Sequence, residues 1–248
     1  MATQSPSPAT PPPAHIAAHI TQVYLAYTSL LQTATTLSSP PTEGPLGGQL
    51  LYVAELDSTA SPIIRAASIA GTATLAASSS DVALRQAQRD GVIDFLVNSL
   101  DEALRILKNE IRKRQPVAVA VSLESRLVTQ EMQDRGVLPD LLPHASSPDH
   151  DALLAPFLAQ GARLLPAPST DPDRKIYIWP IPVAYTNRPG EFEAILETYL
   201  SPEDQPAHRW LRLSSRYLDP TARRYRSIPI GPDSVEKLAK KFGPPLKA

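Results

Sequence analysis

The 248-residue chain contains no cysteine, which excludes disulfide bonds, thiolate metal sites, iron–sulfur clusters and a cysteine nucleophile. Glycine is scarce, with 10 residues. The 24 basic and 25 acidic residues nearly balance, so no overall field attracts the chain to nucleic acid or to a membrane. No apolar run approaches the ~20 residues that a membrane helix needs. The first 14 residues lack the basic and apolar stretches of a secretory signal. We therefore expect a cytoplasmic protein with no membrane partner.

Proline is abundant, with 27 residues, and the apolar fraction of 42% is sufficient for a folded core. Residues 1–13 are almost all Ser, Thr, Ala and Pro, a composition that predicts a disordered tail. A helix and a linker are expected over 14–48, because apolar residues recur there on one helical face. These residues are Ile16, Ile20, Val23, Tyr27, Leu30 and Leu31.

Between residues 49 and 145, short apolar runs alternate with amphipathic helical stretches. Strands are expected at 50–54, 72–76, 92–97, 116–121 and 140–142. Helices are expected at 62–70, 81–89, 100–114 and 124–135. This alternation predicts an α/β fold, a parallel sheet with helices on both faces.

Residues 146–248 follow as a Pro-rich segment and a basic C-terminal α+β extension. Helices are expected there near 150–160, 191–200 and 234–242, with a strand at 175–179.

Three separated pieces of the middle segment resemble the NAD-binding Rossmann-like domain of urocanase (urocanate hydratase). The pieces are residues 48–71, 89–110 and 116–142, which include SLDEAL at 99–104 and RGVLPD at 135–140. The resemblance implies a Rossmann-like fold, NAD as the family cofactor and a hydro-lyase ancestry.

The sequence departs from that family at the residues that would hold NAD. Aligned without a gap, the loop glycines of the family fall on Glu55, Asp57, Ser58, Ala60 and Ser61. Glycine is needed there because the backbone approaches the pyrophosphate closely. Two carboxylates at ~4 Å from that pyrophosphate would repel it by about 1–4 kcal/mol. The acidic residue expected for the ribose after the second strand and the catalytic cysteine of the family are also missing. We therefore expect no cofactor, and NAD only if the resemblance outweighs the lost glycine loop.

Hydroxyl groups gather where the predicted strands end, at the sheet edge where α/β proteins bind ligands. With the amides of a helix N-terminus they could hold a small-molecule anion such as a sugar phosphate. The simpler interpretation is that Ser58 and Ser61 cap the following helix. The candidate ligand-binding residues are Asp57, Ser58, Thr59, Ser61, Ser78, Ser79 and His144.

Two histidine-containing groups suggest metal ligands, and the simpler interpretation is favoured for both. His15 and His19 share one side of a helix without a nearby acidic residue, so a polar helix flank is expected. His144, Asp149, His150 and Asp151 follow no specific metal spacing, so a solvated loop with a helix cap at Asp149 is expected. No metal site is predicted, and no catalytic residue is assigned.

The last 48 residues are basic, with ten Lys and Arg against five Asp and Glu. Trp210, Tyr217 and Tyr225 are interleaved with the arginines, a pattern that can bind single-stranded nucleic acid or an acidic partner. A solvated surface with the aromatic rings packed inward is the favoured interpretation, so a nucleic-acid partner is not expected.

These observations favour a divergent, non-catalytic urocanase-like domain that senses a ligand or binds a protein partner. A homo-oligomer is left open. The alternative is an enzyme, either an NAD-dependent lyase of the urocanate hydratase type or a small-anion or sugar-phosphate enzyme that uses Asp57–Ser61.

Overall fold

The computed structural model describes residues 14–34, 44–144, 148–168 and 175–246. The chain forms two compact units, one of residues 23–169 (the sheet unit) and one of residues 1–22 with 170–248 (the C-terminal unit). The division falls within the first helix, α1 (Ala14–Ala34). The expected apolar face of α1 is confirmed, because Ile16, Ile20, Val23, Tyr27 and Leu30 are all buried.

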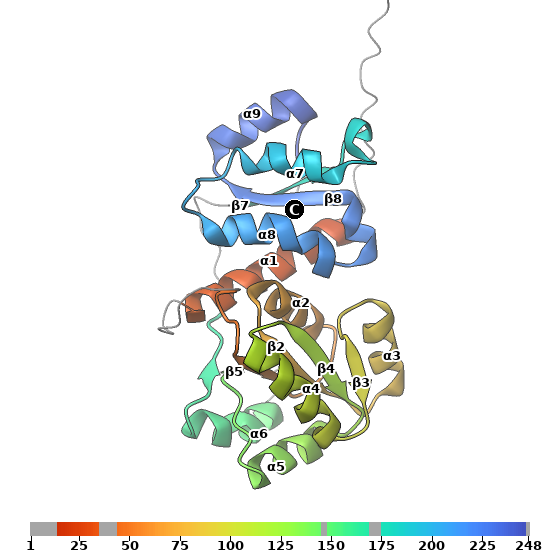
Figure 1. Ribbon diagram of the computed structural model, residues 1–248, viewed down its shortest axis with the longest axis vertical. Coiled ribbons are helices and arrows are strands. Elements are labelled where there is room, and N and C mark those ends of the chain that lie inside the picture. Colours follow the sequence, from red (N-terminus) through yellow and green to blue (C-terminus); the bar gives the residue numbers. More distant parts are fainter. Residues whose placement is uncertain (1–13, 35–43, 145–147, 169–174, 247–248) are drawn as a thin grey trace, which may run out of the picture. The chain divides into compact units, whose positions relative to one another are not determined.

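The sheet unit is built on a six-stranded sheet in which every pair of neighbouring strands is parallel. The order across the sheet is β3-β4-β2-β1-β5-β6; Figure 1 labels β3, β4, β2 and β5 of this sheet. The strands are β1 (Leu50–Val53), β2 (Ala73–Ala77), β3 (Phe95–Val97), β4 (Val117–Val121), β5 (Leu141–Leu142) and β6 (Arg163–Leu164). The predicted α/β fold with a Rossmann-like parallel sheet is confirmed.

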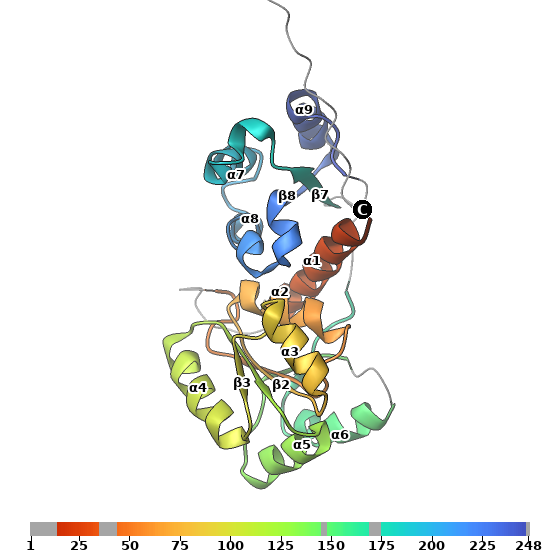
Figure 2. The same cartoon turned by 90° about the vertical axis from the view of Figure 1, so that its right-hand side faces the viewer.

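Helices cover both faces of this sheet (Figures 1 and 2). They are α2 (Ala60–Ala70), α3 (Asp81–Arg89), α4 (Leu100–Lys113), α5 (Ser125–Asp134) and α6 (Pro148–Ala159). The connections from β1 to β2 and from β2 to β3 run toward one edge of the sheet, and the later connections run toward the other. Because such crossovers are right-handed, α2 and α3 cover one face, whereas α4, α5 and α6 cover the other.

One hydrophobic core lies between the sheet and α4, α5 and α6. Tyr52, Leu75 and Val119 of the strands pack there with Leu107 of α4 and Phe157 of α6. All five residues of the apolar run in β4 are buried, as expected of a strand covered on both faces.

Several helix ends follow the sequence signals. The hydroxyl groups of Ser80 and Ser99 accept the backbone N–H groups of Ala83 and Glu102, which caps α3 and α4. Gly136, which follows α5, has a φ of +64°, a conformation that suits glycine.

Two expectations for the sheet unit differ from the structure. The third strand begins at Phe95 rather than Val92, because the backbone N–H of Val92 donates instead to the carbonyl of Ala87 and closes the end of α3. Residues 148–168, expected as a Pro-rich segment outside the Rossmann-like domain, contribute α6 and the edge strand β6 to the sheet unit.

The C-terminal unit contains an antiparallel pair of strands, β7 (Lys175–Pro180) and β8 (Tyr225–Ile230). Its helical elements are η1 (Val183–Tyr185), α7 (Pro189–Glu197), α8 (Gln205–Tyr217), η2 (Pro220–Arg224) and α9 (Pro232–Phe242). Trp179, Phe192, Leu211, Ile228 and Leu238 form its core. Within the described residues, no helix is long and apolar enough to cross a membrane.

Candidate functional site

The candidate site lies at the carboxyl edge of the sheet, between the ends of β1 and β5. The helix after β1 packs on one face, and the helix after β5 packs on the other. The loops that leave two such neighbouring strands diverge, and ligands of open α/β sheets bind at this divergence. The fold therefore brings the loop of Asp57 next to His144.

The N-terminus of α2 is occupied by the carboxylate of Asp57. Its Oδ1 atom accepts the backbone N–H of Thr59 at 2.8 Å and of Ala60 at 2.9 Å. The same oxygen accepts the hydroxyl of Thr59 at 2.6 Å. The first free amides of the helix are thus paired with a carboxylate from this chain.

The sequence-based choice of capping residue was wrong. Ser61 lies inside α2, which begins at Ala60, and Ser58 is an exposed loop residue whose side chain does not cap the helix. Asp57 caps the helix instead, although it lies two residues before Thr59. The short side chain of an aspartate can accept the backbone N–H groups of the residues that follow it.

Glu55, the second carboxylate of this loop, spans the carboxyl edge. Its Oε1 accepts the hydroxyl of Ser78 at 3.0 Å, and its Oε2 accepts the hydroxyl of Ser125 at 2.5 Å. Ser78 follows β2, and Ser125 begins α5 after β4. Both serines are almost fully buried. One side chain therefore joins the ends of three neighbouring strands.

A buried hydroxyl chain continues from this point into the core. The hydroxyl groups of Tyr52 and Thr129 lie 2.8 Å apart, and Thr129 donates to the carbonyl of Ser125. Burial raises the pKa of Tyr52, and the negative charge of Glu55 adds to that effect. Tyr52 is therefore a neutral structural group.

The space that remains at the β1–β5 edge is small. The cavity lined by Glu55, Asp57, Thr59 and His144 has a volume of about 30 Å³, which is enough for about one water molecule. No lysine or arginine lines it. Its polar wall suits neutral or positively charged groups better than anions.

The structure brings together only some of the candidate ligand residues. Asp57, Thr59 and His144 share the small cavity, whereas Ser78 is held by Glu55. Ser58 and Ser79 are exposed to solvent. Sequence reasoning did not select Glu55 or Ser125 for this site, although both stand just after strands that end at the same edge.

The residues at this edge differ from those that a dinucleotide site needs. A dinucleotide needs free amides at this helix N-terminus and glycines that admit its pyrophosphate. Here Asp57 already takes the amides of Thr59 and Ala60, and Glu55 is tied across the edge.

The structure describes only part of the two histidine groups. Within the described residues, no three His, Cys, Asp or Glu side chains are placed to share a metal ion. Asp149, expected as a helix cap, lies inside α6, which begins at Pro148. The side chains of Asp149 and His150 lie outside the described residues.

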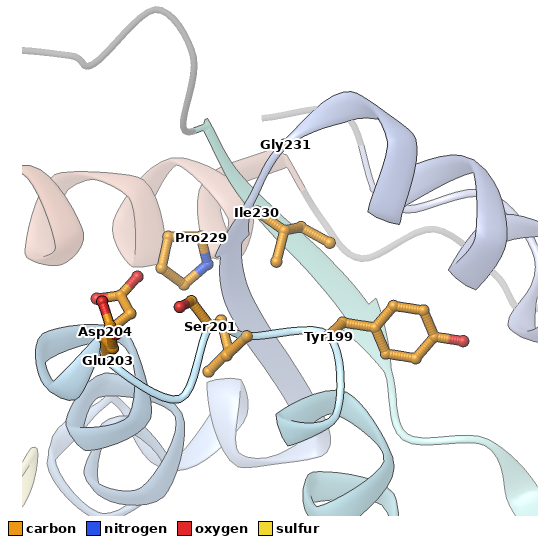
Figure 3. Close-up of a pocket in the computed structure, with 8 residues that line it drawn as sticks. Tyr199, Ser201, Glu203, Asp204, Pro229, Ile230 and Gly231 are labelled. Carbon is orange, nitrogen blue, oxygen red and sulfur yellow. The ribbon is translucent and has the colours of Figure 1, made fainter.

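The C-terminal unit carries a larger, open cavity of about 580 Å³ beside the end of β8 (Figure 3). Glu203 and Asp204 lie toward one end of it and Tyr199 toward the other, with Pro229 and Ile230 between them. Asp204 caps α8 by accepting the backbone N–H of Ala207. No positive charge lines this cavity.

The aromatic residues of the basic tail face inward or lie half-buried. Trp210 is fully buried, and its indole N–H donates to the hydroxyl of Ser227 at 3.0 Å. Tyr217 and Tyr225 are half-buried. Trp210 therefore cannot stack on a base.

Comparison with known families agrees with this fold. A family model described as the urocanase Rossmann-like domain matches residues 29–170, which includes the whole six-stranded sheet.

Proposed function

Because the chain belongs to the urocanase Rossmann-like domain family, we propose that it keeps the family fold without NAD and acts as a partner-binding module. The main support for this proposal is that the carboxylate of Asp57 accepts hydrogen bonds from the backbone amides at the start of α2. An NAD pyrophosphate would need those same amides.

The displacement of Asp57 by a phosphate is unfavourable for two reasons. The incoming anion would have to break three hydrogen bonds to Oδ1 and would leave the carboxylate close to its own negative charge. Glu55 adds a second charge at the same edge, and its links to Ser78 and Ser125 hold it there. Loss of dinucleotide affinity is the expected result.

A protein partner is favoured over a small ligand because the β1–β5 cavity is far below the roughly 300–1,000 Å³ of ligand pockets. Large apolar side chains are instead exposed farther along the carboxyl edge of the sheet, after β2 and β4. Val82 at the start of α3 is 77% exposed, and Leu127 at the start of α5 is 57% exposed. The hydroxyl of Ser122 and the carboxylate of Asp81, 3.5 Å apart, connect the two loops. Exposed apolar side chains of this kind anchor protein interfaces.

The first test is a calorimetric titration of the full chain with NAD, with and without urocanate, together with an assay of urocanate hydration. We expect no binding up to millimolar NAD and no turnover. Micromolar binding would overturn the proposal and would favour the NAD-dependent lyase instead.

The partner role is tested with two matched double variants. V82S/L127S removes the apolar groups at the carboxyl edge, whereas L138S/L158S removes exposed leucines elsewhere on the sheet unit. Affinity capture with quantitative mass spectrometry should identify a protein that is lost only with V82S/L127S. Equal recovery with both variants would contradict a partner at this edge, and light scattering distinguishes a second copy of the chain.

A further inference from the structure

The outer face of α8 in the C-terminal unit carries a line of arginines. The helix buries Ala207, Trp210, Leu211 and Ser214 along one side. Arg209, Arg212 and Arg216, spaced three and four residues apart, fall on the opposite side of the helix. Arg212 and Arg216 are exposed.

The basic surface continues beyond the end of α8. Only Leu218 and Asp219 separate α8 from η2, which contacts α8 and carries the exposed residues Arg223 and Arg224. Arg212, Arg216, Arg223 and Arg224 are defined here as the arginine face.

Five acidic residues of this unit take part in other interactions. Glu191 pairs with Arg188, Glu193 with the buried Arg226, and Glu197 with His208. Asp204 and Asp219 accept backbone amides at the starts of α8 and η2. In the part of the chain that the structure describes, no member of the arginine face forms an ion pair. The face therefore has a local positive field although the whole chain is almost neutral.

The surroundings of the arginine face distinguish between classes of polyanion. Among the described residues of 175–246, Val183 is the only large apolar side chain that is strongly exposed. An acidic protein or an anionic membrane would lack the apolar anchors that such interfaces use. Trp210 is buried and Tyr217 and Tyr225 are half-buried, so single strands would find less of the aromatic stacking surface that they use. The phosphates on the outside of a duplex can be bound without apolar anchors and without an aromatic stacking surface.

We propose that the arginine face binds the phosphate backbone of double-stranded nucleic acid. A guanidinium group can donate two parallel hydrogen bonds to one phosphate, and four such groups can hold successive phosphates. These contacts carry no base information, so binding is independent of sequence. The proposal concerns the C-terminal unit and does not depend on the proposed function of the sheet unit.

The test uses the full chain and a fluorescein-labelled 20-base-pair DNA duplex of arbitrary sequence, followed by anisotropy. Each neutralised phosphate contributes about 0.9 to the slope of log affinity against log salt. Four contacts therefore predict a slope of about −3.6, and an affinity loss on the order of 100-fold between 50 and 200 mM salt. The same measurement with a second, unrelated duplex should give the same affinity.

Two charge-matched variants assign the contacts. R212Q/R216Q/R223Q/R224Q removes the arginine face, and K175Q/K237Q/K240Q/K241Q removes four exposed lysines from β7 and α9. We expect the arginine variant to lose at least tenfold in affinity and most of the salt slope, and the lysine variant to lose less than threefold. Circular dichroism confirms that both variants fold.

Three results would overturn the proposal. The first is an absence of duplex binding at 50 mM salt. The second is an equal loss of affinity in the two variants, which would indicate a general charge effect. The third is binding to phosphatidylserine vesicles or to polyglutamate without binding to the duplex, which would identify another class of partner.

Discussion

The carboxylate of Glu55 accepts the hydroxyl of Ser125 at 2.5 Å, although the two residues lie 70 positions apart in the chain. The same side chain accepts the hydroxyl of Ser78, so the ends of β1, β2 and β4 share one acceptor. In a dinucleotide-binding fold this edge is kept open for the cofactor. Here the side chain of Glu55 spans this edge and links the strands.

Replacement of Glu55 by alanine should lower the free energy of unfolding by about 1–3 kcal/mol, because the buried hydroxyl groups of Ser78 and Ser125 lose their acceptor. Urea unfolding followed by circular dichroism measures the change. The control is Glu203→Ala, which removes an exposed carboxylate and should stay within about 0.5 kcal/mol of the wild type. An equal effect of the two variants would contradict a linking role for Glu55.

Replacement of Asp57 separates its capping role from its charge. Asp57→Ala should destabilise by about 1 kcal/mol through loss of the cap on Thr59 and Ala60. Asp57→Asn should stay close to the wild type in stability, because asparagine caps equally well. Phosphate should stabilise Asp57→Ala more than Asp57→Asn in a thermal melt, since only the former frees the amides. Equal responses of the two variants to phosphate would show that the amides are not the obstacle.

The stability of the protein should depend on Tyr52 at alkaline pH. Burial raises the pKa of Tyr52, so the folded chain keeps a proton that the unfolded chain releases above pH of about 10. The stabilisation is complete below that pH and is lost as the pH rises, by up to about 1.4 kcal/mol per pH unit.

Tyr52→Phe should remove this part of the pH dependence. At pH 8 the variant should be less stable by about 1 kcal/mol, because the hydrogen bond to Thr129 is lost. Urea titrations at pH 8 and pH 11 should show that this difference shrinks or reverses at the higher pH. A constant difference between the two proteins would mean that Tyr52 ionises normally in the folded chain.

The sheet unit could be predicted from the sequence where local signals and tertiary packing agree. The alternation of apolar strands and amphipathic helices located β4, α3 and α4 closely, and Ser80 and Ser99 cap the two helices, as serine favours. The start of β3 was missed because Val92 and Ile93 are apolar but close the end of α3. Apolar residues alone do not distinguish a strand from such a turn.

The candidate site was only partly predictable. Strand order is needed to know that Ser125 lies next to Glu55, and the order of β1, β2 and β4 comes from crossover directions that the residues do not encode locally. The sequence singled out Asp57 as a charge that opposes a phosphate. The sequence did not show that the carboxylate of Asp57 accepts the amides at the start of α2, because this depends on the geometry of the loop.

The C-terminal unit was the least predictable part, since α8 and β8 were not expected. Trp210 illustrates the reason. Its neighbours in the chain are basic, and a mixture of aromatic and basic residues is typical of both a binding surface and an amphipathic helix. The signal that could have predicted the helix is the helical spacing of its buried residues, which are Ala207, Trp210, Leu211 and Ser214.

The pair of Trp210 and Ser227 gives a direct test of the core of this unit. Trp210→Phe and Ser227→Ala each remove one partner of a buried hydrogen bond, and each should destabilise by about 1–3 kcal/mol. The double variant leaves no unpaired group, so it should be more stable than the sum of the single effects predicts, by about 1 kcal/mol. Thermal melts of the four proteins complete the cycle. Strict additivity would mean that the two groups do not interact, and the inward orientation of Trp210 would then be wrong.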